Sequence, residues 1–143
     1  MKKTNKGFSL LELLIVVAII LIIATIAIPS LLRSRQAAHE AAAVATLRTI
    51  NTAEVTYLSS SNGNYGTIAD LIGGALIPSN FGGTVSGYNF SIVAAGGDFT
   101  VTADPATAND GRYGYYITPD GVVRYSSATS LAPVGSAGSP VSQ

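Results

Sequence analysis

The sequence has no cysteine, no tryptophan, one histidine and few charged residues among its 143 positions. Without cysteine, no disulfide bond can form, and the usual zinc, iron–sulfur and haem sites lose most of their ligands. Only 11% of the residues are charged and 48% are hydrophobic, which argues against a chain that is disordered throughout. Eight basic and eight acidic residues leave no net charge, so we predict no contact with nucleic acid. The length suits a single domain.

The balanced charge hides an uneven distribution along the chain. Residues 1–7 contain three lysines and no acidic residue, and residues 8–28 are almost all apolar. As a helix, the apolar segment would be about 32 Å long, enough to cross a hydrocarbon core of about 30 Å. The lysines in front of it predict a cytoplasmic N-terminus, so the rest of the chain should lie outside the cytoplasm.

A cleaved secretory signal and a plain membrane anchor both explain this segment poorly. The apolar run is longer than the roughly 7–15 residues of a signal peptide, and no A-x-A-like cleavage site follows it. A plain anchor leaves Glu12 unexplained, because a carboxylate in a spanning helix costs about 2.5–3.5 kcal/mol at the bilayer centre. Glu12 therefore indicates a function inside the apolar segment.

The residues around Glu12 form a motif, Lys6-Gly7-Phe8-Ser9-Leu10-Leu11-Glu12. The motif resembles that of the type IV prepilins, a family that includes the pseudopilins of type II secretion. In that family a basic leader ends in glycine, an aromatic residue follows, and a glutamate stands five residues after the cleaved bond. The resemblance implies that a prepilin peptidase cuts between Gly7 and Phe8 and methylates the new amine of Phe8. It also implies that Glu12 contacts a neighbouring subunit and sets the register of assembly.

The chemistry of these residues agrees with such processing. Gly7 has no side chain and can enter a tight protease cleft in an extended conformation. Cleavage would remove the leader lysines and leave an amine on Phe8, one helical turn from Glu12. In an apolar medium, an amine and a carboxylate compensate each other's desolvation only when they are paired. The pair can form within one chain or between two chains, where it would fix register as buried polar groups do in coiled coils.

Pro29 lies just beyond the apolar run, where the family has a proline that interrupts the helix. Proline lacks an N–H and clashes with the carbonyl four residues earlier, so we expect a kink or local melting at Pro29. The resemblance implies that this stretch extends when the helix enters a filament. A plain kink at the membrane boundary is the alternative.

The rest of the chain predicts an α+β fold. The helix should continue to about residue 58, with an apolar stripe at Ala43, Leu47, Ile50, Ala53 and Tyr57. The remaining helix surface should carry Arg33, Arg35, Glu40, Arg48 and Glu54. A capping box at Thr67 should open a short helix to residue 72. Alternating residues predict strands at 88–93, 99–103, 113–118 and 122–126. Hairpin turns are expected at residues 95–98, Ala-Gly-Gly-Asp, and at Pro119-Asp120-Gly121.

We therefore predict a pilin fold, in which a long N-terminal helix, half transmembrane and half amphipathic, packs on a four-stranded antiparallel sheet. The sheet face with Tyr88, Phe90, Ile92, Phe99 and Val101 should cover the helix stripe. The expected division is a removed leader (1–7), a transmembrane and filament-core half-helix (8–29), a globular domain (30–126) and a flexible tail rich in Ser, Ala, Gly and Pro (127–143). Many type IV pilins close a C-terminal loop with a disulfide, so here packing, filament contacts or metal must replace it.

Other candidate sites receive little support. No metal ligand, cofactor or catalytic residue is predicted, because His39 has no recognisable nucleophile beside it. Four aspartates lack the spacing of a calcium loop and adjoin turn-forming residues: Asp98, Asp104, Asp110 and Asp120. Alternation along the strands assigns most of the seven tyrosines to core and sheet positions.

The resemblance implies a structural protein and not an enzyme: a major pilin of an extracellular type IV pilus, inserted in the inner membrane before assembly. The implied partners are identical subunits, the inner membrane, prepilin peptidase and an assembly machinery with an ATPase. Adhesion, twitching motility, DNA uptake and conduction are all compatible with it. Two alternatives stay open: a pseudopilin of a short periplasmic pseudopilus, and an anchored single-pass binding module for which Glu12 would be dispensable.

Overall fold

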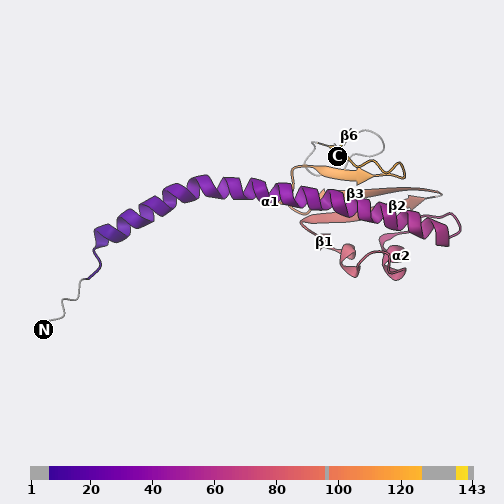
Figure 1. Ribbon diagram of the computed structural model, residues 1–143, viewed down its shortest axis with the longest axis horizontal. Coiled ribbons are helices and arrows are strands. Elements are labelled where there is room, and N and C mark those ends of the chain that lie inside the picture. Colours follow the sequence, from indigo (N-terminus) through magenta and orange to yellow (C-terminus); the bar gives the residue numbers. More distant parts are fainter. Residues whose placement is uncertain (1–6, 96, 127–137, 142–143) are drawn as a thin grey trace. The chain divides into compact units, whose positions relative to one another are not determined.

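The computed structural model describes residues 7–95, 97–126 and 138–141, and Figure 1 shows its elements. A long helix, α1 (Leu10–Ser60), is followed by a short helix, α2 (Ile68–Gly73), and a 3-10 helix, η1 (Ser79–Gly82). The strands are β1 (Thr84–Val85), β2 (Tyr88–Ala95), β3 (Asp98–Pro105), β4 (Gly114–Ile117), β5 (Arg124–Ser126) and β6 (Ser139–Pro140). The α+β class is therefore confirmed.

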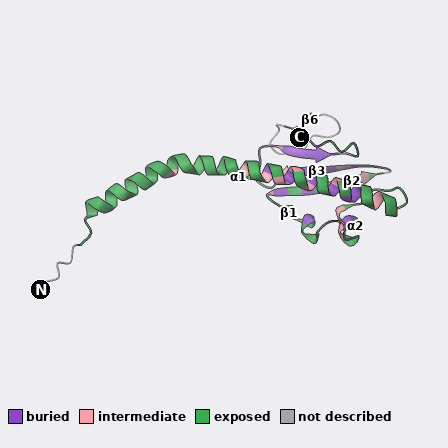
Figure 2. Ribbon diagram, in the orientation of Figure 1, coloured by how far each residue is buried: buried purple, intermediate pink, exposed green. Residues whose placement is uncertain are grey.

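The chain divides into two compact units, residues 1–34 and 35–143. In the first unit, nearly all described side chains of α1 are exposed although most are apolar (Figure 2). An 18-residue window of α1 has a mean hydropathy of 3.1, so this helix is long and apolar enough to cross a membrane. The hydroxyl of Thr25 donates to the carbonyl of Ile22 at 2.7 Å, which satisfies a polar group in this apolar stretch. The segment therefore presents apolar surface on all sides.

The helix continues across Pro29, which lies inside α1. The residues before and after Pro29 are helical. Local melting does not occur in this structure, and the expected bend and its extension in a filament stay predictions.

The core of the second unit lies between α1 and one face of the sheet. The helix stripe is buried at Ala43, Leu47, Ile50 and Ala53, with Tyr57 packed against it, as the spacing predicts. The sheet face supplies Tyr88, Phe90, Phe99 and Val101, with Ile92 partly buried beside them, which confirms the predicted face. The core thus depends on two periodicities, near 3.6 in the helix and 2 in the strands.

Within the described residues, the sheet has six strands instead of the predicted four, all antiparallel and in the order β1-β2-β3-β4-β5-β6. The additional strands, β1 and β6, are two residues long and pair with β2 and β5 at the edges. Two residues are too few to give an alternating pattern, so the sequence could not indicate these strands. The β2–β3 hairpin is in register from Tyr88↔Pro105 to Ala95↔Asp98.

The structure confirms two features that short sequence patterns predicted, the cap of α2 and the turn between β4 and β5. Thr67 caps α2: its hydroxyl accepts from the N–H of Asp70, and the Asp70 carboxylate accepts from the N–H of Thr67. Between β4 and β5, Gly121 has φ 74° and donates its N–H to the carbonyl of Thr118 at 2.9 Å. This closes the predicted turn at residues 119–121.

Most of the expected tail, residues 127–137 and 142–143, lies outside the described residues. Its described part contains β6, where Ser139 pairs with Tyr125 and Pro140 with Arg124. The N–H of Val141 also donates to the carbonyl of Val123 at 2.9 Å. Backbone hydrogen bonds therefore join residues 139–141 to the sheet in a chain that has no disulfide.

Candidate functional site

The motif around the expected cleavage point lies at the start of α1. Gly7, Phe8 and Ser9 are not helical, and α1 begins at Leu10. No atom lies within 4 Å of where a side chain at Gly7 would begin, and Phe8 is 82% exposed. The bond between Gly7 and Phe8 is thus accessible and outside regular structure. These are the conditions that a protease needs to bind a backbone segment.

Ser9 and Glu12 cap this helix end in a variant of the capping box, in which the Ser9 hydroxyl accepts from the second backbone N–H of the helix instead of the third. The N–H of Ser9 donates to Oε2 of Glu12 at 2.9 Å, and Oγ of Ser9 accepts from the N–H of Leu11 at 3.3 Å. Two backbone donors of the first turn are satisfied in this way. The sequence analysis missed this contact, although Ser9-Leu10-Leu11-Glu12 has the S-x-x-E pattern that indicates it.

The capping box gives the Glu12 carboxylate a partner within its own chain. Among the described residues, Ser9 supplies the only hydrogen bond to this carboxylate. The other oxygen, Oε1, remains open to a donor from a second chain. In lipid, a carboxylate with one backbone N–H partner is less costly than one with none. The geometry therefore allows one contact at the helix start and one outside it.

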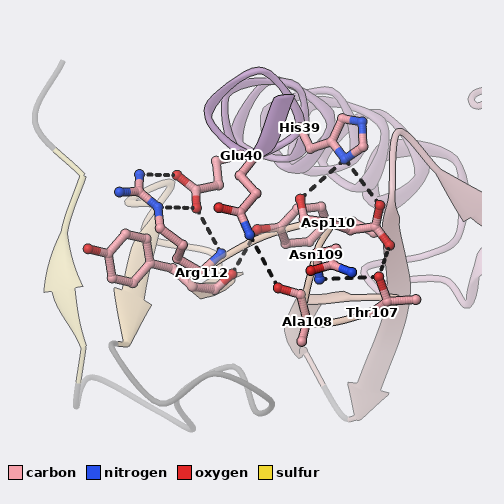
Figure 3. A network of polar contacts seen from close by, with 10 residues as sticks. His39, Glu40, Thr107, Ala108, Asn109, Asp110 and Arg112 are labelled. Carbon is pink, nitrogen blue, oxygen red and sulfur yellow. Dashed lines mark hydrogen bonds and ion pairs between the residues drawn. The ribbon is translucent and has the colours of Figure 1, made fainter. Parts of the chain in front are cut away.

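A second polar site lies in the globular unit, where α1 holds the connector between β3 and β4 (Figure 3). Glu40 is only 7% exposed and accepts three hydrogen bonds from Arg112. The backbone N–H and Nε of Arg112 reach Oε1 at 2.8 and 3.0 Å, and Nη2 reaches Oε2 at 2.8 Å. Burial acts to raise the pKa of Glu40, but the Arg112 hydrogen bonds and charge outweigh it, and this pKa lies below its usual value.

The same connector contacts α1 at two more residues. Nε2 of Gln36 donates to the carbonyl of Ala108 at 3.2 Å. Nδ1 of His39 lies 3.2 Å from the carbonyl of Asp110 and 3.5 Å from its Oδ1. Both neighbouring atoms are acceptors, so Nδ1 carries a proton. His39 is partly buried, with a side chain 19% exposed, and it serves the fold by holding the connector to α1.

Two glycines allow the connector to approach the helix and the sheet this closely. Gly87 has φ 78°, and a Cβ there would collide with the His39 ring and approach Asp110 at 3.0 Å. A Cβ at Gly111 would collide with the Tyr88 hydroxyl, which donates to the carbonyl of Tyr113 at 2.9 Å. Any larger residue at either position must displace these side chains.

A second glutamate of α1, Glu54, is fully buried at 0% exposure. Its Oε2 accepts from the N–H of Gly66 at 2.9 Å, which joins the loop after α1 to the helix. Burial raises the pKa of Glu54, the Gly66 hydrogen bond lowers it, and the charge of Asp70 raises it, so that the net shift is upward.

The expected surface positions of Glu40 and Glu54 were therefore wrong. Both residues continue the buried stripe at spacings of three and four, because Glu40 precedes Ala43 by three and Glu54 follows Ile50 by four. The helical spacing alone would have placed both residues on the buried stripe. They were expected at the surface because they are charged. Each carboxylate has a backbone N–H from a distant segment as partner, which makes its burial possible.

Four tyrosines stack through the sheet side of the core. Their ring centroids lie 5.2–6.3 Å apart in the pairs Tyr88–Tyr115, Tyr115–Tyr125 and Tyr113–Tyr125. Burial, followed by the charge of Glu40, raises the pKa of Tyr115 to about 12. This hydroxyl stays neutral at ordinary pH, so the cluster acts through packing, as the strand alternation predicts.

The four aspartates occupy local positions in turns and strands. Asp98 begins β3, and its Oδ1 accepts from the N–H of Phe99; Asp104 lies within β3. Asp110 accepts from the hydroxyl of Thr107 in the connector. The carboxylate of Asp120 accepts from Thr118, Val122 and Arg124 in the β4–β5 turn.

Comparison with known proteins identifies the N-terminal motif and places the chain in a family. A model of the prokaryotic N-terminal methylation motif matches residues 2–28. The chain is 36% identical over 97 residues to the type IV major pilin protein PilA of Myxococcus xanthus, covering 68% of this chain but only 41% of that protein. It is 37% identical over 93 residues to the type IV wide pilus major component PilA4 of Thermus thermophilus, covering 65% of this chain and 67% of that protein. No solved structure shows a significant match.

These matches agree with the geometry described above. The methylation motif covers Gly7, Phe8 and Glu12. Helix α1 and an antiparallel sheet packed against its second half are the main elements of the described chain. With the motif, this architecture and a relative matched over two thirds of its length, the chain belongs to the type IV pilins.

Proposed function

We propose that this chain is the major structural subunit of an extracellular type IV pilus. The carrying observation is the start of α1, where an exposed Gly7–Phe8 bond precedes a helix that is apolar on all sides except at Glu12. The names of the two relatives, both major pilus components, support the same role. A helix with no polar face needs either lipid or other helices around it.

Processing comes first in this proposal. A prepilin peptidase cuts between Gly7 and Phe8 and methylates the new amine. The cut removes three lysines and leaves Phe8 at the N-terminus, next to the capping box. Before assembly the chain resides in the inner membrane, with its globular unit outside the cytoplasm.

Assembly then joins identical subunits through their N-terminal half-helices, residues 8–29. Moving from lipid into a helix bundle brings little hydrophobic gain, so close packing and polar contacts must supply the specificity. In this proposal, the N-terminal amine of one subunit binds the Glu12 carboxylate of another. The backbone N–H of Ser9 donates a hydrogen bond to the same carboxylate from within its own chain. An assembly machinery with an ATPase would supply the work of extraction from the membrane.

Mass spectrometry of the mature N-terminus, combined with electron microscopy of fibres sheared from cells, tests this function. We expect a chain that begins at N-methylated Phe8 and that is the most abundant protein of long fibres. A processed chain that is absent from long fibres would contradict the pilus and favour a pseudopilus. A chain that begins at Met1 would contradict the processing itself.

A further inference from the structure

Glu54 stands out as a carboxylate that the proposed filament does not use. It belongs to the buried stripe of α1 in the globular unit and is inaccessible to solvent. One of its oxygens, Oε2, accepts from the N–H of Gly66. The other, Oε1, is buried and has no hydrogen-bond partner among the described residues. A buried ionised carboxylate with one oxygen unpaired would be strongly unfavourable.

A second unpartnered oxygen lies on the same helix, one turn away. Oδ1 of Asn51 is also buried without a partner among the described residues. Residues three apart on a helix have Cβ atoms about 5–6 Å from each other, within reach of a glutamate and an asparagine side chain. Both atoms are hydrogen-bond acceptors in their usual states, so neither can donate a hydrogen bond to the other.

The surrounding charges make an ionised Glu54 less favourable still. The charge of Asp70 of α2 acts on Glu54 and raises its pKa. Two tyrosines flank the Gly66 partner: Tyr65 precedes it in the sequence, and the Tyr57 ring of α1 lies against it. By strand alternation, the charged residues of the sheet lie on the face away from α1: Asp98, Asp104 and Arg124. A proton bound to Glu54 would neutralise the carboxylate and would also supply the hydrogen-bond donor that the two oxygens lack.

We propose that Glu54 is a buried proton-binding site, in which the protonated Oε1 donates a hydrogen bond to Oδ1 of Asn51 while Oε2 accepts from Gly66. One proton then satisfies both unpartnered oxygens. The upward shift in the pKa of Glu54 agrees with this assignment.

An Asn51 side chain turned the other way would offer a competing solution. Its Nδ2 could then donate to an ionised Glu54, and no proton would be needed. In the structure Nδ2 instead lies toward the β4–β5 turn, 3.8 Å from where a side chain at Gly121 would begin. Oδ1 is the Asn51 atom that is buried without a partner among the described residues. The two solutions predict opposite effects of pH on stability.

The raised pKa of Glu54 determines how the stability of the fold changes with pH. A carboxyl group whose pKa is raised by folding stabilises the fold fully below its unfolded pKa, and this contribution is lost as pH rises through the folded pKa. Between the unfolded and the folded pKa, one linked proton changes the unfolding constant by about tenfold per pH unit, and above the folded pKa this dependence ends. Glu40 has a lowered pKa and is the matched control on the same helix, with the opposite sign.

The test measures urea unfolding of the globular unit in the full chain, held in neutral detergent micelles, from pH 5 to pH 9. The variants are Glu54→Gln, which keeps an acceptor for Gly66 and adds a permanent donor for Asn51, and Glu40→Gln. We expect Glu54→Gln to match the wild type at low pH and to become the more stable chain as pH rises. Glu40→Gln should instead be less stable than the wild type throughout this range, because the lowered pKa of Glu40 keeps it ionised from pH 5 upward.

A Glu54→Gln chain that loses stability relative to the wild type as pH rises would overturn the proton and support the turned Asn51. A difference between the two chains that depends on sodium at constant ionic strength would also overturn it, in favour of a bound cation. Should Glu54→Gln not fold, the carboxyl carbon of Glu54 in the wild type can be titrated by NMR. A midpoint above the usual range of glutamate supports the proposal, and one at or below that range overturns it.

Discussion

Glu40 and Arg112 lie 72 residues apart in the sequence and meet in a two-pronged ion pair, with Nη2–Oε2 at 2.8 Å and Nε–Oε1 at 3.0 Å. The backbone N–H of Arg112 adds a third bond to the same carboxylate. This pair joins the connector after β3 to α1, and Gln36 and His39 hold the same connector nearby. The contact thus fixes the sheet to the helix at the first turns of the globular unit.

Removing Arg112 should destabilise the globular unit. The variant Arg112→Ala leaves Glu40 buried without its side-chain partner, and we expect a loss of about 2 kcal/mol in the free energy of unfolding. The guanidinium is half exposed, which limits the cost to less than that of a fully buried pair. Chemical unfolding of the full chain measures it. Arg112→Lys should recover only part of the loss, because an ammonium cannot form the two-pronged contact; full recovery would contradict the role of that geometry.

Acid should weaken the β4–β5 turn through Asp120. The hydrogen bond from Arg124, with smaller contributions from Val122 and Thr118, lowers the pKa of Asp120 to about 2. A lowered pKa stabilises the fold above the unfolded value of 3.8, and this contribution is lost as pH falls toward about 2. The variant Asp120→Asn should therefore reduce the acid sensitivity of unfolding between these values. An unchanged acid profile would show that the turn does not depend on this charge.

Glu12 should be required for assembly but not for cleavage. We expect Glu12→Ala to be cut after Gly7 and to form no fibres when it is the only pilin in the cell. Glu12→Gln is the informative companion, because its amide oxygen can still accept from Ser9 while the charge is gone. Electron microscopy and N-terminal mass spectrometry give both results. Normal fibres from Glu12→Gln would contradict a charge-dependent contact between subunits.

Ser9 should protect the first turn of α1. The variant Ser9→Ala removes the hydroxyl that accepts from the N–H of Leu11, and loss of such a cap costs about 1 kcal/mol. Hydrogen exchange at Leu11, followed by NMR in micelles, should then become about fivefold faster, which corresponds to that energy. Ser9→Thr retains a hydroxyl cap and should exchange like the wild type. Equal exchange in all three chains would show that the capping box does not form.

Replacement of Gly87 by alanine should cost more than replacement of Gly97. Both glycines have positive φ, 78° and 91°, so both variants suffer similar backbone strain. Only at Gly87 would the new Cβ also collide with His39, whereas no atom lies within 4 Å at Gly97. We expect Gly87→Ala to lower the thermal midpoint further than Gly97→Ala. Equal effects would mean that the connector moves aside at little cost.

The sequence predicted those parts of the fold that depend on local patterns. The stripe through Leu47 and Ile50, the capping box at Thr67 and the turn at residues 119–121 come from short-range chemistry, and the structure confirms them. The family motif around Gly7 and Phe8 could also be recognised from the sequence, because its residues are contiguous. Its functional roles at Phe8 and Glu12 stay predictions.

Contacts between distant segments could not be predicted in the same way. The burial of Glu40 and Glu54 depends on backbone donors at Arg112 and Gly66, and no local pattern connects these residues. The pairing of β6 with β5 also depends on a return of the chain, and two residues carry too little pattern to indicate it. The sequence thus predicted which faces of the helix and the sheet are apolar, but not which polar side chains are buried on those faces.

The strictly sequential order of the sheet has a consequence for how the chain folds. Each strand pairs with the one before it along the chain, so the sheet can grow by adding one hairpin at a time. The slow step should then be the docking of this meander on α1, which must close loops of about 70 residues between Gln36 or Glu40 and the connector. A subunit whose α1 is inserted in the membrane before residues 84–126 are delivered would have its helix in place before the sheet that covers it is complete.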